Sequence, residues 1–173
     1  MLIDTIKDSL LTVNTDANRK HWANHIKNNH IELSSLIGLI EAEHPVAMRF
    51  SWLLGDLCER SPEIVSPMVT LLFNKRHQVT IPHFNRSLAK FFYYCGIPEE
   101  IAGEAMDELF TWLLDVNSNV STKHYSMLAL YQLALKHPDI QPELKAAIQH
   151  QLTLNTATFE KLARKILFKL GSI

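Results

Sequence analysis

The chain has 173 residues, of which 47% are hydrophobic and 20% are charged. This composition is ordinary for a folded globular chain and excludes a disordered one. The net charge of -1 excludes a global electrostatic pull toward nucleic acid or a membrane surface, although a balanced total can conceal an uneven distribution.

Helical periodicity predicts an all-α chain of about five helix pairs. The pairs are expected at residues 2–29, 31–60, 63–95, 98–136 and 140–169. Within them, the helices are expected at 2–12, 16–29, 31–42, 45–60, 63–75, 82–95, 98–115, 120–136, 140–153 and 156–169. Asp16 is the expected N-cap of the second helix. No stretch alternates with period two for long enough to predict a strand.

Internal repetition is the strongest pattern in the chain. A basic residue recurs in the first turn of each second helix, at Arg19, Arg49, Arg86, Lys123 and Lys161. The first helices of the last three pairs share an apolar i, i+4, i+8 pattern, which would lie on one helix face. Its members are Ile64, Met68, Leu72, Ile101, Ala105, Leu109, Ile140, Leu144 and Ile148. The repetition predicts a single α-solenoid domain over residues 1–173.

The segment HPVAMRFSWLLGDL, followed by SPEIVSPMVTLLF, resembles a HEAT or armadillo-type repeat. The resemblance covers nearly the whole chain and implies a right-handed α-α superhelix. More narrowly, RFSWLLGDLCER, KHYSMLALYQL, HPDIQPELKAAI and FEKLARKILFKL resemble a group of small bacterial helical proteins, some of which are named adenylosuccinate lyase. That enzyme family carries a Met-Pro-Lys-Asn-Pro type loop. The nearest string here is SPMVTLL, so no catalytic residue is carried over.

Charge is segregated between the two kinds of predicted helix. The first helices carry 3 Lys and Arg against 12 Asp and Glu, whereas the second helices carry 13 Lys and Arg against 4 Asp and Glu. In HEAT-like solenoids the second helices usually line the concave surface, so the resemblance implies a basic groove. Such a groove would suit an anionic partner, namely an acidic peptide, a phosphorylated segment or nucleic acid.

Four basic residues of the second-helix layer are candidate contacts for that partner. Arg49, Arg86 and Lys123 belong to the first-turn series, and each could instead bond a carboxylate or a helix end of the neighbouring repeat. Lys90 stands in a register that is apolar in the neighbouring repeats. It is either an edge residue with an extended apolar stem or a partly desolvated amine with a lowered pKa.

Trp52 and Asp56 complete the candidate set, because their i, i+4 spacing points them the same way on one helix. The pair resembles the aromatic-plus-carboxylate arrangement of helical-repeat alkylpurine DNA glycosylases. In that family rings hold the damaged base and an acid stabilises developing positive charge. The alternative is a core Trp beside a surface Asp.

No cofactor, metal site or catalytic residue is predicted. His21 and His25 could share an ion at i, i+4, but the string HWANH lacks the Glu of a metalloprotease helix. Cys58 and Cys95 lie in apolar helical runs and are interpreted as core residues in a reducing compartment. The first residues do not have the pattern of a signal peptide or a membrane anchor, which indicates a cytoplasmic protein with no membrane partner.

The sequence therefore favours a non-enzymatic helical-repeat scaffold that binds a protein or an acidic peptide through the second-helix layer. Nucleic-acid binding or DNA alkylation repair is the alternative from another class. A lyase activity, as the narrower resemblance implies, is a third. The oligomeric state is not addressed by any pattern in the chain.

Overall fold

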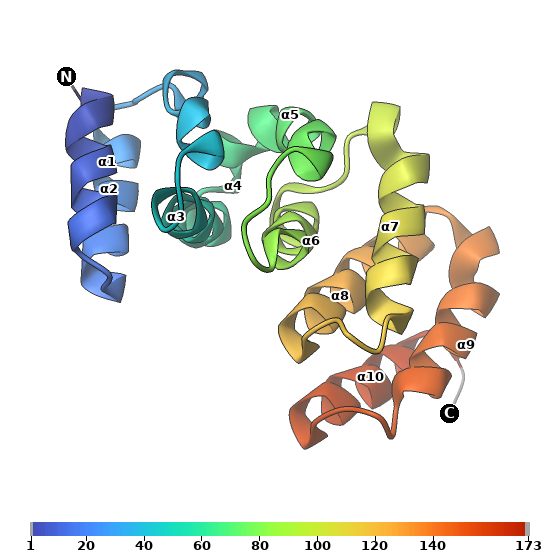
Figure 1. Ribbon diagram of the computed structural model, residues 1–173. Coiled ribbons are helices and arrows are strands. Elements are labelled where there is room, and N and C mark those ends of the chain that lie inside the picture. The colour runs from blue at the N-terminus through green and yellow to red at the C-terminus, as the bar shows by residue number, and fades with distance from the viewer. Residues whose placement is uncertain (1, 172–173) are drawn as a thin grey trace. The chain divides into compact units, whose positions relative to one another are not determined.

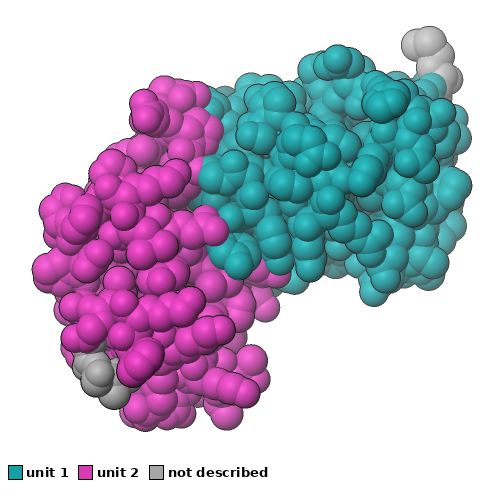
Figure 2. All heavy atoms as spheres, turned by 180° about the vertical axis from the view of Figure 1, so that it is seen from behind, with its two compact units in different colours: residues 1–96 teal, residues 97–173 magenta. Residues whose placement is uncertain are grey.

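The computed structural model describes residues 2–171, and all regular structure in that range is helical (Figure 1). The chain divides into two compact units, unit 1 (Met1–Gly96) and unit 2 (Ile97–Ile173), which are coloured separately in Figure 2. Each unit is built of consecutive helix pairs whose apolar faces form its core. The predicted all-α class and paired layout are confirmed.

Unit 1 contains three pairs, and the second helix of each pair is a regular α-helix. The second helices are α2 (Asp16–Asn28), α3 (Val46–Arg60) and α6 (Phe84–Cys95). The first helix of the first pair is α1 (Leu2–Thr12). The α2 helix packs on α3, and α3 packs on α6, so the three second helices lie side by side.

The first helices of the second and third pairs are broken, where the sequence predicted continuous helices. Residues 31–42 form the 3₁₀ turns η1 (Leu33–Ser35) and η2 (Ile37–Glu41). Residues 63–75 fall within α4 (Pro62–Val65), η3 (Ser66–Met68), α5 (Val69–Asn74) and η4 (Lys75–His77). Pro67 lacks an N–H, which interrupts the helical ladder. In the earlier segment the Ser35 hydroxyl donates to the Glu32 carbonyl at 2.7 Å, which competes with the backbone pattern.

Unit 2 contains two pairs with more regular helices. They are η5 (Glu99–Ile101), α7 (Ala102–Leu114), α8 (Val120–Lys136), η6 (Pro138–Ile140), α9 (Gln141–Gln151) and α10 (Ala157–Lys169). The two first helices each open with a 3₁₀ turn beside a Pro, either Pro98 or Pro138. The predicted boundaries of this unit agree with the observed ones to within a few residues.

The predicted apolar pattern is fully buried in unit 2 and partly buried in unit 1, where Met68 and Leu72 are buried and Ile64 is half-buried. The triplet Ile101, Ala105 and Leu109 is buried, as is Ile140 with Leu144 and Ile148. In the aromatic run of α6, Phe91 and Phe92 are fully buried, while Tyr93 and Tyr94 are half-buried and stack edge to face at 4.7 Å. Four consecutive rings on one helix cannot all face the core, and here two of them lie at its edge.

The N-cap predicted for α2 was wrong by one residue. Thr15 is the cap, since its side-chain oxygen accepts from the Asn18 backbone N–H at 3.1 Å. Asp16 is instead the first helical residue, where its carboxylate lies close to the positive end of the helix. Asp16 lies one helical turn before Arg19 in α2, and the two side chains pair at the site described below.

Candidate binding pocket

A pocket of about 390 Å³ opens on the second helices of unit 1. Its lining residues are Asn14, Asp16, Arg19, Ser51, Trp52, Gly55, Asp56, Arg86, Ser87 and Lys90. All but Asn14, which precedes α2, come from α2, α3 and α6. We call this site the Arg86 pocket.

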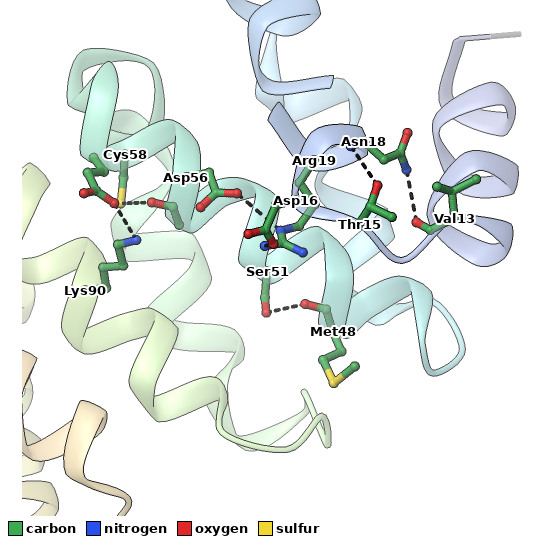
Figure 3. Close-up of polar contacts among 12 residues, drawn as sticks. Val13, Thr15, Asp16, Asn18, Arg19, Met48, Ser51, Asp56, Cys58 and Lys90 are labelled. Atoms are coloured by element: carbon green, nitrogen blue, oxygen red, sulfur yellow. Dashed lines mark hydrogen bonds and ion pairs between the residues drawn. The ribbon is translucent and has the colours of Figure 1, made fainter. Parts of the chain in front are cut away.

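Arg19 is held between two carboxylates on one side of the Arg86 pocket (Figure 3). Its guanidinium pairs with Asp16 one turn earlier on α2, and its Nε donates to Asp56 Oδ2 on α3 at 3.3 Å. The same guanidinium lies over the Trp52 ring, with its carbon 5.5 Å from the ring centroid. Arg19 therefore links α2 to α3 and fixes both members of the predicted Trp52–Asp56 pair.

Lys90 belongs to α6, and its side chain reaches the neighbouring helix α3. Its ammonium pairs with Glu59 at 3.0 Å and stands 5.8 Å from the centre of the Tyr94 ring. Its side chain is only 12% exposed, and its stem runs past Gly55. This arrangement agrees with the predicted edge lysine whose apolar stem is covered while its charged end reaches a polar partner.

Arg86 is the cation of the pocket that has no carboxylate partner. It is exposed in the first turn of α6, and its side chain makes no hydrogen bond or ion pair with the residues that the structure describes. Beside it, the Ser87 hydroxyl donates to Ser51 Oγ at 3.4 Å, and Ser51 donates to the Met48 carbonyl at 2.8 Å. The pocket thus combines one unpaired guanidinium, an aromatic ring and a polar floor.

Two of the six predicted contact residues lie elsewhere. Arg49 points to the end of α1, where its Nη1 donates to the carbonyls of Leu10 at 2.6 Å and Leu11 at 2.9 Å. Lys123 is in unit 2, where it is 5% exposed and donates to Gln151 Oε1 at 2.8 Å. Both cations bond protein groups, which is the structural role that the sequence left open for them.

The sequence did not single out Arg19, Ser51, Gly55 or Ser87 as site residues. Arg19 could have been found, because it occupies the same first-turn position as Arg86 in the repeated basic series. Ser51 and Gly55 are small residues at i, i+4 within an otherwise apolar helix. Such a pair indicates either a close helix contact or a hollow, and only the packing of α6 against α3 distinguishes the two.

The other candidate groups do not form a metal or nucleophile site. No cluster of three or more His, Cys, Asp or Glu side chains suited to a metal ion occurs among the described residues. His21 and His25 stack with ring centroids 6.3 Å apart beside the buried Trp22. A hydrogen bond with Cys95, together with burial, raises the pKa of the Cys58 thiol. Cys58 is therefore protonated and unreactive at neutral pH.

Stacked helix pairs, with a polar pocket on the second helices, define an all-α helical-repeat protein. The chain belongs to the HEAT repeat domain family, whose model matches residues 6–170. No match was found among curated proteins or among solved structures. Members of this family are typically non-catalytic scaffolds that mediate protein interactions. Within the described residues, none of the helices has the length and apolar character needed to cross a membrane.

Proposed function

We propose that this chain is a non-enzymatic scaffold that binds an acidic segment of another protein at the Arg86 pocket. One observation carries the proposal: Arg86 is an exposed cation with no partner among residues 2–171, and it shares with Trp52 a pocket on three adjacent second helices. Arg and Trp are the residue types that most often dominate the energy of a protein interface. An acidic segment supplies the charge that Arg86 lacks.

The family supports a scaffold role, and the Arg86 pocket supports the proposed position of its binding surface. In helical-repeat proteins the function resides in a few surface residues rather than in the fold. The partner surface is proposed for unit 1, because the Arg86 pocket lies there. In unit 2, Lys123 is buried against Gln151, and Lys161 is exposed but does not line this pocket.

The test is the affinity of the full chain for a fluorescent Glu-rich peptide, measured at two salt concentrations. We expect binding that weakens with salt, and about a tenfold loss on Arg86→Glu. The matched control is Arg60→Glu, because Arg60 is an exposed arginine at the end of α3 that does not line the pocket. Equal losses in both variants would reject the pocket, and a Glu-to-Gln peptide that binds equally well would reject acidic recognition.

Nucleic-acid binding is supported by the presence of Trp52 and Asp56 in one pocket. It is the less favoured function, because both residues are engaged by Arg19. Base recognition needs a free ring face, and stabilisation of positive charge needs an uncompensated acid. Binding of duplex DNA at low salt that exceeds binding of the acidic peptide would favour this alternative.

A further inference from the structure

The charges and hydrogen bonds around the Arg86 pocket define its ligand more narrowly. Resting on the proposed function, we infer that the pocket receives a single carboxylate together with a neighbouring amide N–H. Arg86 is the residue that binds the carboxylate, and Gly55 is the residue that leaves room for it. The carboxylate can come from an acidic side chain or from the end of a chain, and both sources present the same two groups.

The six charged groups at the pocket, Arg19, Arg86, Lys90, Asp16, Asp56 and Glu59, are neutral in sum. An anion therefore gains from its direct contact with Arg86 and not from a net positive pocket, which favours a ligand with one negative charge over a ligand with two. Arg19 is compensated by Asp16 and Asp56, and Lys90 is compensated by Glu59 at 3.0 Å. Among the lining cations, Arg86 is the one that no carboxylate of the described residues pairs with. A dianionic phosphate would gain the same partner and would also face two carboxylates across the pocket, so the second charge is disfavoured. The planar guanidinium matches the two oxygens of a carboxylate.

The floor of the pocket offers acceptors rather than donors. The Ser87 and Ser51 hydroxyls donate to Ser51 Oγ and to the Met48 carbonyl, so their oxygens remain only as acceptors. Asp56 uses Oδ2 for Arg19, while its other oxygen has no partner among the described residues. A ligand therefore needs N–H donors beside its carboxylate, and an acidic residue within a peptide carries both.

Gly55 is the position that keeps this space open. It lies inside α3, where glycine is less favourable than alanine, and its backbone does not adopt a positive φ. A Cβ built there would lie 3.6 Å from Lys90 Cδ and 3.8 Å from Lys90 Nζ, which is ordinary contact. Neither the backbone nor the packing therefore requires glycine. The missing side chain leaves volume in the pocket instead.

These observations predict opposite effects of Gly55→Ala on stability and on binding. The variant should raise the melting temperature by about 2–4 °C, because alanine favours the helix. It should also weaken ligand binding about threefold or more, because the methyl group occupies the pocket. A purely structural role for Gly55 would change stability and leave binding unchanged. A rise in melting temperature with unchanged affinity would overturn this part of the inference.

The ligand class is tested by titrating the ¹⁵N-labelled full chain with small probes and following the Trp52 indole N–H. Trp22 and Trp112, both buried, serve as internal references. We expect N-acetylglutamate α-amide to shift the Trp52 signal at millimolar concentration. The neutral N-acetylglutamine amide should bind about tenfold more weakly, and inorganic phosphate should bind more weakly than the carboxylate. N-acetylalanine separates a chain-terminal carboxylate from a side-chain carboxylate, and the tighter of the two identifies the source.

Arg86→Lys keeps the charge and removes the planar fork, so about a fivefold loss is expected for the carboxylate probe. Equal binding of the glutamate and glutamine probes, or tighter binding of phosphate, would overturn the inference. The proposed function can be judged separately. If the acidic peptide binds in an Arg86-dependent way while no small carboxylate shifts Trp52, the inference fails and the proposed function stands. If neither binds, both fail.

Discussion

Arg49 provides a direct test of which basic residues are structural. Its Nη1 donates to the carbonyls of Leu10 and Leu11 in the last turn of α1, where helix carbonyls lack intrahelical partners. Arg49→Met keeps much of the side-chain length and removes both hydrogen bonds. A hydrogen bond from a charged donor contributes about 1.5–3 kcal/mol when it is buried. Leu11 is exposed, so water can replace Arg49 at its carbonyl.

The hydrogen bond to the Leu10 carbonyl therefore dominates, and Arg49→Met should lower the free energy of unfolding by about 2 kcal/mol. For a chain of this size that corresponds to a fall of about 4–8 °C in melting temperature. Thermal unfolding followed by circular dichroism measures the fall, and hydrogen exchange should show faster exchange in α1. Arg60→Met is the control, because the Arg60 side chain has no described partner. If Arg49→Met were as stable as the parent chain, the structural role of Arg49 would be refuted and its predicted role in partner binding would return.

Three further predictions concern titratable groups that are buried or half-buried. Burial lowers the pKa of His124 in the folded chain. The contribution of His124 to the free energy of unfolding is therefore complete above about pH 6.5 and is lost as the pH falls through its folded pKa. In His124→Gln, the free energy of unfolding should depend less on pH in this acid range. Burial also lowers the pKa of Lys123, so its contribution to stability should rise as the pH increases from the lowered folded pKa to the unfolded pKa of about 10.4. Lys123→Met should flatten that rise in alkaline unfolding measurements. The raised pKa and the burial of Cys58 predict that iodoacetamide labels this thiol only after unfolding. Peptide mass spectrometry measures the labelling, and rapid labelling of Cys58 in the folded chain would contradict its burial.

The helical repeat was predictable because its signals are local and repeated. The apolar positions of the first helices and the prolines between helices each recur, so an error at one position is corrected by the others. The breaks at Ser35 and Pro67 were missed because the periodic apolar pattern continues through them. The local preferences for turn and 3₁₀ geometry outweighed that pattern in these two segments.

The pocket was only partly predictable because its assembly depends on pairing between helices. Trp52 and Asp56 were placed together by their spacing on one helix. The sequence could not reveal that Arg19 would reach Asp56 from α2, or that Arg49 would turn toward α1. Arg19 and Arg49 occupy the same position in the repeat. Their different roles follow from what the neighbouring helix presents, a carboxylate in one case and free carbonyls in the other.

The central claim is that an acidic segment binds on the second helices of unit 1. Its most direct test is a ¹H–¹⁵N correlation spectrum of the full chain, recorded with and without a Glu-rich peptide. The account predicts that the largest shifts fall on backbone amides around Arg19, Trp52 and Arg86, together with the Trp52 indole. Shifts confined to unit 2, or spread evenly over exposed basic residues, would contradict it.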